Sequence, residues 1–220
     1  MNTYIDQTVE FVRTRLAQAE AGHDWWHILR VWNNVKQILP HEQPADALVC
    51  ELTALLHDIA DSKFHNGDET IGPQIAGNHL RAIGVDEARI THVQEIIRNM
   101  SYSTGLGDTT FRSPEMDIVQ DADRLDAIGA IGIARAFHYG GFKNRELYNP
   151  NISPVAHIDK ATYKHSTAPT INHFYEKLLL LKDKMNTQTA RKLAAPRHAF
   201  MEQYLAQFMT EWDGGGAPVQ

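Results

Sequence analysis

The chain has 220 residues and carries 21 basic against 27 acidic side chains, which gives a formal net charge of −6. That balance argues against a binder of nucleic-acid polymers, because such proteins use many Lys and Arg side chains to displace counterions from phosphates. The first residues show no basic stretch followed by an apolar run, and no apolar stretch approaches the roughly 18 residues of a membrane span. We therefore expect a cytoplasmic protein without disulfides, since Cys50 is its one cysteine.

Apolar residues recur at helical spacing along the first half of the chain. Gly22 is expected to end the first helix, Asp24 can cap the second, and Gly84 is expected to end the fourth. The fifth helix is expected to start at Asp86 or Glu87 and to end near Met100. The first four predicted helices are residues 3–19, the apolar stripes from Trp25 to Leu39 and from Leu48 to Ile59, and residues 73–83.

The second half contains longer segments without helical periodicity. Two of them, residues 101–114 and 139–169, are long enough for functional loops, and the latter is interpreted as a lid or a large insertion. Pro196 should kink or divide the last helix. Within the predicted helix 115–138, two glycines suggest the close approach of a neighbouring helix or a ligand. The predicted helices are 115–138, one that opens at Thr170, and a final stretch from about Thr187 to Trp212.

No segment alternates apolar and polar residues over the length of a strand, and no internal repeat is visible. These patterns predict an all-α, single-domain bundle of about eight or nine helices over residues 1–212. Residues 213–220, which are rich in glycine, are predicted to form a disordered tail.

Histidine and aspartate side chains mark three separated stretches of the chain, and the count of 12 histidines is high. His57 and Asp58 stand together at the end of the Leu-rich helix, where an imidazole and a carboxylate could bind a first-row metal ion. On its own such a pair is more typical of a helix C-terminus, where the His meets the helix dipole and the Asp faces water. The addition of His27 and of the carboxylates at 121–126 favours a metal site.

This order of residues, His, then His-Asp, then Asp, resembles the HD-domain metal-dependent phosphohydrolase superfamily. Within it, the chain is similar to the stand-alone bacterial subgroup that resembles nucleotide pyrophosphohydrolases, and the likeness covers roughly residues 5–212. The stretches that carry the resemblance are GHDWWHILRVW at 22–32, LHDIADSKF at 56–64, QDADRLDAIGAIG at 120–132, HFYEKL at 173–178 and KMNT at 184–187.

The resemblance implies that His27, His57, Asp58 and one carboxylate of the third stretch bind a divalent metal ion. Asp121 and Asp123 point about 200° apart on a helix, so they are not expected to face the same ion. The family pattern places its ligand directly before a basic residue and Leu, which selects Asp123 and leaves Asp121 as the alternative. Asp126, one turn after Asp123, could hold a ligand or Arg124 in place.

Further residues are assigned roles around that ion. Asp61, one turn after Asp58, is a candidate for orienting or deprotonating the attacking water, and Lys63 for neutralising phosphate charge in catalysis and substrate binding. For each of them, an ordinary surface side chain is the alternative. The remaining candidates for substrate binding are His92, Arg124 and Lys177, for which a surface or salt-bridged structural role is the alternative.

The function that this resemblance implies is hydrolysis of a phosphate ester or anhydride in a small nucleotide. We expect (deoxy)nucleoside triphosphates to be cleaved to the monophosphate and pyrophosphate, with one Mn²⁺ or Mg²⁺ ion preferred and Fe²⁺, Co²⁺ or Zn²⁺ as alternatives. A nucleotide phosphatase or phosphodiesterase is a second reading, and a non-catalytic sensor of nucleotides or metal is a third. The expected partner is a small phosphorylated substrate, with no membrane and no nucleic-acid polymer, and a homodimer is left open.

Overall fold

The structure is a computed structural model, and it describes residues 3–17, 24–42, 44–60, 70–100, 111–155 and 167–215. Those ranges contain nine α-helices and no strand, so the prediction of an all-α fold is confirmed. The α-helices are α1 (Thr3–Arg15), α2 (Trp25–Ile38), α3 (Ala47–Leu56), α4 (Ile71–Ala82), α5 (Glu87–Asn99), α6 (Pro114–Asp126), α7 (Gly129–Phe142), α9 (Thr170–Glu176) and α10 (Gln188–Trp212). Two short 3₁₀ helices, η1 (Leu39–His41) and η4 (Leu178–Lys184), follow α2 and α9.

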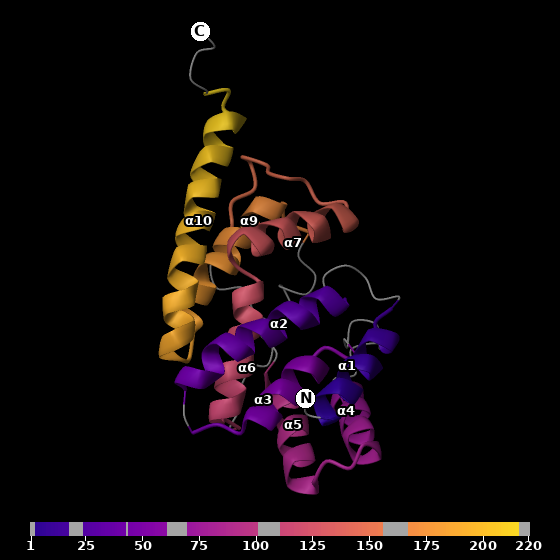
Figure 1. The fold of residues 1–220 in the computed structure, drawn as a ribbon. Helices are drawn as coiled ribbons and strands as arrows, with labels where there is room; N and C mark the ends of the chain where they lie inside the picture. The colour runs from indigo at the N-terminus through magenta and orange to yellow at the C-terminus, as the bar shows by residue number, and fades with distance from the viewer. Residues whose placement is uncertain are drawn as a thin grey trace.

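Helix α3 lies at the centre of the lower part of the molecule, where it packs against α1, α2, α5 and α6 (Figure 1). Its N-terminus is capped by Asp46, whose side chain accepts hydrogen bonds from the amides of Leu48 and Val49. Beyond the first turn it is apolar almost all round and its leucines are fully buried, as expected of a helix that is surrounded by others. His57, which directly follows the last residue of this helix, therefore has its side chain in the interior.

The starts and stops of several helices agree with the sequence. Asp24 and Asp86 cap α2 and α5 by accepting a hydrogen bond from the amide three residues on, and Thr187 caps α10 in the same way. Gly84 follows α4 with a φ of 86°, in the left-handed region that glycine tolerates. Pro196 does not divide α10, which continues from Gln188 to Trp212.

The prediction of one helix over 115–138 is wrong. The chain forms α6 and α7 instead, which are separated at residues 127–128, and Gly129 at the start of α7 has a φ of 74°. A Cβ atom at this position would lie 3.0 Å from the Cβ of Arg197 on α10. The glycine is therefore explained by a turn and by the close approach of a neighbouring helix. Residues 139–142, predicted to be irregular, form the last turn of α7.

Helices α7 and α9 and the C-terminal half of α10 lie in the upper part of the molecule (Figure 1). An aromatic cluster joins them. Phe137 lies at its centre, with ring centroids 5.9–6.4 Å from those of Phe174, Tyr204 and Phe208. Tyr148 and Trp212 extend the cluster to the end of α10. These contacts place α7 against α9 and α10, and α7 also packs against α6. Among the described helices, none is long and apolar enough to cross a membrane.

Candidate metal centre

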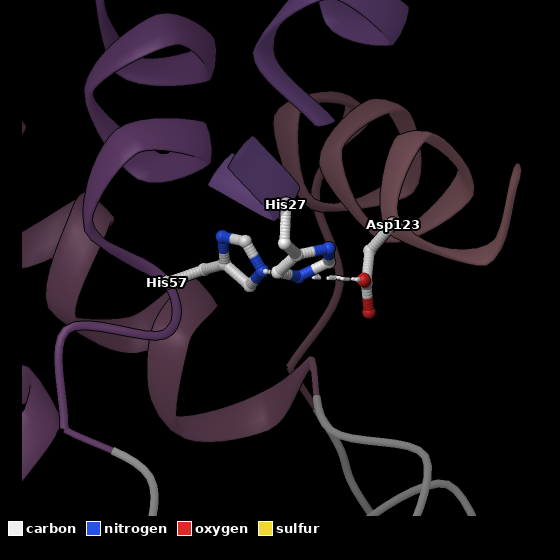
Figure 2. A group of neighbouring side chains, drawn as sticks. All are labelled: His27, His57 and Asp123. Carbon is white, nitrogen blue, oxygen red and sulfur yellow. Dashed lines mark hydrogen bonds and ion pairs between the residues drawn. The ribbon is translucent and has the colours of Figure 1, made fainter. Parts of the chain in front are cut away.

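Three separate segments of the chain bring His27, His57 and Asp123 together. His27 lies in the first turn of α2, where its amide donates to the capping carboxylate of Asp24 at 3.0 Å. His57 follows directly after α3, and Asp123 lies near the end of α6. Figure 2 shows the two imidazoles and the carboxylate directed toward one another from these three segments.

The distances between these side chains are those of one cluster. The Nε2 atoms of His27 and His57 are 3.3 Å apart, and Asp123 Oδ1 lies 3.6 Å and 4.0 Å from them. One ligand atom from each of the three residues lies within 4.8 Å of the others. Asp58 Oδ2 is 3.8 Å from His27 Nε2. All four side chains for which metal binding was predicted are therefore neighbours.

The far side of each imidazole ring faces a hydrogen-bond acceptor. His27 Nδ1 is 2.8 Å from Asp126 Oδ2, and His57 Nδ1 is 2.9 Å from the carbonyl oxygen of Ala54. Because a carboxylate and a carbonyl only accept, both Nδ1 atoms donate, and in the neutral rings both Nε2 atoms carry lone pairs. Burial lowers the pKa of His27, against the opposing effects of Asp126 and Asp123, which favours the neutral ring. Two lone pairs and a carboxylate that face one another form a donor set that fits a divalent cation.

Burial differs between the two kinds of donor. The side chains of His27 and His57 are 2% and 6% exposed, whereas those of Asp58 and Asp123 are 18% and 41% exposed. The imidazoles therefore form the floor of the centre, and the carboxylates lie on its side toward solvent.

Asp126 lies behind the centre and is 2% exposed. Besides His27, its carboxylate accepts hydrogen bonds from Arg30 and Arg135, at 2.6–3.0 Å. Burial raises the pKa of Asp126, but the hydrogen bonds from His27 and Arg30 and the charge of Arg135 outweigh it and hold the pKa well below its usual range. Of the two alternatives predicted for Asp126, the structure shows contact with the histidine and not with Arg124.

Asp121 takes a different position from Asp123. It is fully buried and accepts hydrogen bonds from the amides of Asn186 and Thr187, from the Thr187 hydroxyl and from the Asn186 side chain. These residues directly precede α10, which Thr187 caps. Asp123, and not Asp121, is the carboxylate that the structure brings next to the imidazoles.

The other predicted site residues are distributed as follows. Asp61 and Lys63 lie outside the described residues. Arg124 donates to Asp121 and to the carbonyl of Lys184, and these contacts link α6 to the end of η4. His92 Nε2 is 2.9 Å from Ser113 Oγ and 3.5 Å from Glu115 Oε2, between α5 and α6.

Lys177 directly follows α9, where its amide donates to the carbonyl of His173. The parts that His92, Arg124 and Lys177 play toward a substrate stay predictions.

Sequence reasoning missed the two arginines as partners of Asp126. The position of Arg30, three residues after His27 on the same helix, was a usable signal, because residues at this spacing share a face. Arg135 could not be found in this way. It reaches Asp126 only because the chain turns at residues 127–128.

Comparisons with known proteins identify the proteins that this chain is similar to. A family model described as "HD domain" matches residues 25–128. YpgQ of Bacillus subtilis, described as an uncharacterised protein, is 37% identical over 212 residues, which cover 95% of this chain and 94% of YpgQ.

Solved structures are similar over nearly the whole chain as well. An HD-superfamily hydrolase from Bacillus thuringiensis has a TM-score of 0.73 at 42% identity, covering 95% of this chain and 96% of the other. The structure of B. subtilis YpgQ in complex with ADP has a TM-score of 0.74 at 36% identity, covering 94% of each chain.

Proposed function

The chain belongs to the HD-domain family, and from this premise we propose that it is a metal-dependent hydrolase of phosphate esters or anhydrides. The observation that carries the proposal is the convergence of His27, His57 and Asp123 within 4.8 Å, with both Nδ1 atoms bound to acceptors on the other side of the rings. The similar protein described as an HD-superfamily hydrolase gives independent support.

His27, His57, Asp58 and Asp123 would hold the ion. When bound, a divalent ion in such a set of donors polarises a phosphoryl oxygen and makes a nearby water molecule more acidic. The four side chains hold the donor atoms in place before the substrate arrives, since two of the three segments are helical and the third directly follows a helix. The exposed edge at Asp123 is the side from which a phosphate group can approach, because the imidazoles are covered by the core.

We propose a nucleotide as the substrate, and more narrowly a (deoxy)nucleoside triphosphate cleaved to the monophosphate and pyrophosphate. The complex of YpgQ with ADP supports a nucleotide ligand, because that protein is similar over 94% of this chain. Asp61 and Lys63 are proposed to act on the water and on the phosphate charge. A phosphatase or phosphodiesterase would cleave other bonds at the same site, and a sensor would bind nucleotide without cleaving it.

The proposal can be tested by a screen of nucleotides against Mn²⁺, Mg²⁺, Co²⁺, Fe²⁺ and Zn²⁺, with separate assays for pyrophosphate and orthophosphate. We expect pyrophosphate from triphosphates. Orthophosphate from monophosphates, or ring opening of cyclic nucleotides, would instead identify the phosphatase or phosphodiesterase. Nucleotide binding without any release would identify the sensor.

Asp58→Ala tests the assignment of the metal ligands. We expect this variant to lose most bound metal and nearly all turnover while its helical content is retained. Asp183→Ala is the matched control, because Asp183 is an exposed aspartate of η4, far along the chain, and it should keep wild-type metal binding and turnover. Normal hydrolysis by the Asp58 variant would refute the assignment.

A further inference from the structure

We propose that Asp126 is a positioning residue that orients His27 for metal binding and is itself held by Arg30 and Arg135. This role rests on the proposed function, because it concerns the same metal centre. It assigns a task to three residues that do not reach the ion themselves.

Both oxygens of Asp126 accept hydrogen bonds from side chains. Oδ1 accepts from Arg30 Nε at 2.6 Å, and Oδ2 lies 2.8 Å from His27 Nδ1, 2.7 Å from Arg135 Nη1 and 3.0 Å from Arg30 Nη2. With these contacts and an exposure of 2%, the carboxylate is held by side chains behind the imidazole of His27. Its one contact with the centre is the imidazole.

Helix α6 holds the ring of His27 from two sides. Asp123 and Asp126 are one turn apart and therefore share a face of the helix. Asp123 Oδ1 lies 3.6 Å from Nε2, and Asp126 Oδ2 lies 2.8 Å from Nδ1. The inner carboxylate thus determines which nitrogen carries the proton, and it turns the unprotonated nitrogen toward the outer carboxylate.

The two arginines explain how a charged side chain persists in this position. A buried carboxylate is costly unless it is paired and its hydrogen-bonding capacity is satisfied. Arg30 comes from α2, the helix that carries His27, and Arg135 comes from α7, where it also reaches the main-chain oxygen of Asp126 at 3.3 Å. The cluster therefore connects three helices behind one imidazole.

Asp126→Asn is the direct test, because it keeps the size of the side chain and removes its charge. Partners that orient a metal-binding histidine typically contribute 10–100-fold to metal affinity. We expect the dissociation constant for Mn²⁺, measured by calorimetry on metal-free protein, to rise about 10–100-fold. Asp117→Asn is the matched control, since Asp117 also pairs with an arginine, Arg112, but lies in the first turn of α6, nine residues before Asp126. It should leave the constant unchanged.

A second measurement separates positioning from a purely structural role. In metal-free wild-type protein, ¹⁵N–¹H spectra of the imidazoles should show that His27 carries its proton on Nδ1. In the Asp126→Asn variant a substantial fraction should carry it on Nε2, because the amide group can also donate to the ring. A variant that loses thermal stability but keeps both the Mn²⁺ constant and the wild-type tautomer would overturn the proposal.

Arg135→Met gives a milder version of the same test. Arg30 continues to hold Asp126, so we expect an increase of only a few-fold in the Mn²⁺ dissociation constant. If Asp126→Asn does not fold, the Arg135 variant becomes the deciding test. An unchanged Mn²⁺ dissociation constant in that variant would then contradict the proposed positioning role. Because the tautomer is measured without metal or substrate, the positioning role can be confirmed even if no nucleotide is hydrolysed, and hydrolysis can be confirmed even if the tautomer does not change.

Discussion

Two buried aspartates on α6 have opposite surroundings. Asp121, toward the middle of the helix, receives mostly neutral donors, namely amides, a hydroxyl and a carboxamide at the start of α10. Asp126, at the C-terminal end, receives a histidine and two arginines. Asp121 links α6 to the residues that precede α10, whereas Asp126 contacts a proposed metal ligand, His27.

The pKa values of the two groups move in opposite directions. Burial raises the pKa of Asp121, and the hydrogen bonds from Asn186 and Thr187 and the charge of Arg124 do not fully compensate. For Asp126 burial acts in the same direction, but its hydrogen bonds and the arginine charges reverse the outcome. Two buried carboxylates with similar numbers of donors can therefore differ in proton affinity, because charged and neutral donors stabilise the anion to different extents.

The largest effect on stability is expected from Asp121→Ala. Its removal leaves buried amides and a buried hydroxyl without their acceptor, so the free energy of unfolding should fall by about 3–5 kcal/mol in urea titrations. Asp123→Ala, two residues on and 41% exposed, is the control and should change it by less than about 1 kcal/mol. If the folded Asp121 variant binds Mn²⁺ as weakly as Asp126→Asn, the two clusters are not separate in function.

Gly129→Ala tests the turn that brings α7, and with it Arg135, to Asp126. A φ of 74° is unfavourable for alanine, and the new Cβ would lie 3.0 Å from a side-chain carbon of Arg197. We expect a loss of about 1–2 kcal/mol in the free energy of unfolding. Gly141→Ala, in the same helix with nothing within 4 Å, should be neutral or stabilise by up to about 1 kcal/mol. Equal effects of the two substitutions would argue against a special conformation at the turn.

His173 provides the inverse of the Asp126 cluster, namely a buried titratable group whose neighbours disfavour its charged form. Burial, followed by the charges of Lys177 and Arg145, lowers the pKa of His173 to about 3 from 6.5. Between these values the unfolded chain binds the proton and the folded chain does not, so acid destabilises the fold. At pH 5 this residue should cost on the order of 1–2 kcal/mol relative to pH 7. Urea titrations of His173→Gln should show a correspondingly smaller decrease, and identical pH dependences would contradict this account.

The smallest effect is expected from Asp117→Ala. Asp117 pairs with Arg112 on the surface of α6, with a nitrogen–oxygen distance of 3.1 Å, and the arginine is 69% exposed. Exposed pairs of this kind contribute about 0–1 kcal/mol, because water and salt screen the charges. Thermal unfolding at low and high salt should therefore differ little between variant and wild type. A loss of stability as large as that of Asp121→Ala would mean that burial does not explain the difference between the exposed Asp117 pair and the buried contacts of Asp121.

The sequence was sufficient for features that depend on local pattern. Amphipathic stripes predicted most helices, and capping residues such as Asp24 and Asp86 located their starts, because these interactions lie within a few residues. Helical geometry also separated Asp121 from Asp123. It could not assign their partners, since Thr187 lies 66 residues from Asp121.

The break between α6 and α7 was missed for a related reason. Apolar spacing continues through residues 118–136, whereas the close approach of Gly129 to Arg197 involves another helix and is visible only in space. The order of His and Asp residues was visible in the sequence. The contacts of Arg30 and Arg135 with Asp126 behind His27 were not visible in the sequence, because they depend on how three helices are placed in space.

The two imidazoles of the centre differ in whether an amino-acid substitution can remove the group that orients them. A single codon change can remove the carboxylate that orients His27, whereas His57 is oriented by the carbonyl of Ala54. Every amino acid at position 54 supplies that oxygen. Substitution scans of this protein should therefore detect the orienting group of His27 but not that of His57, although each ring has one.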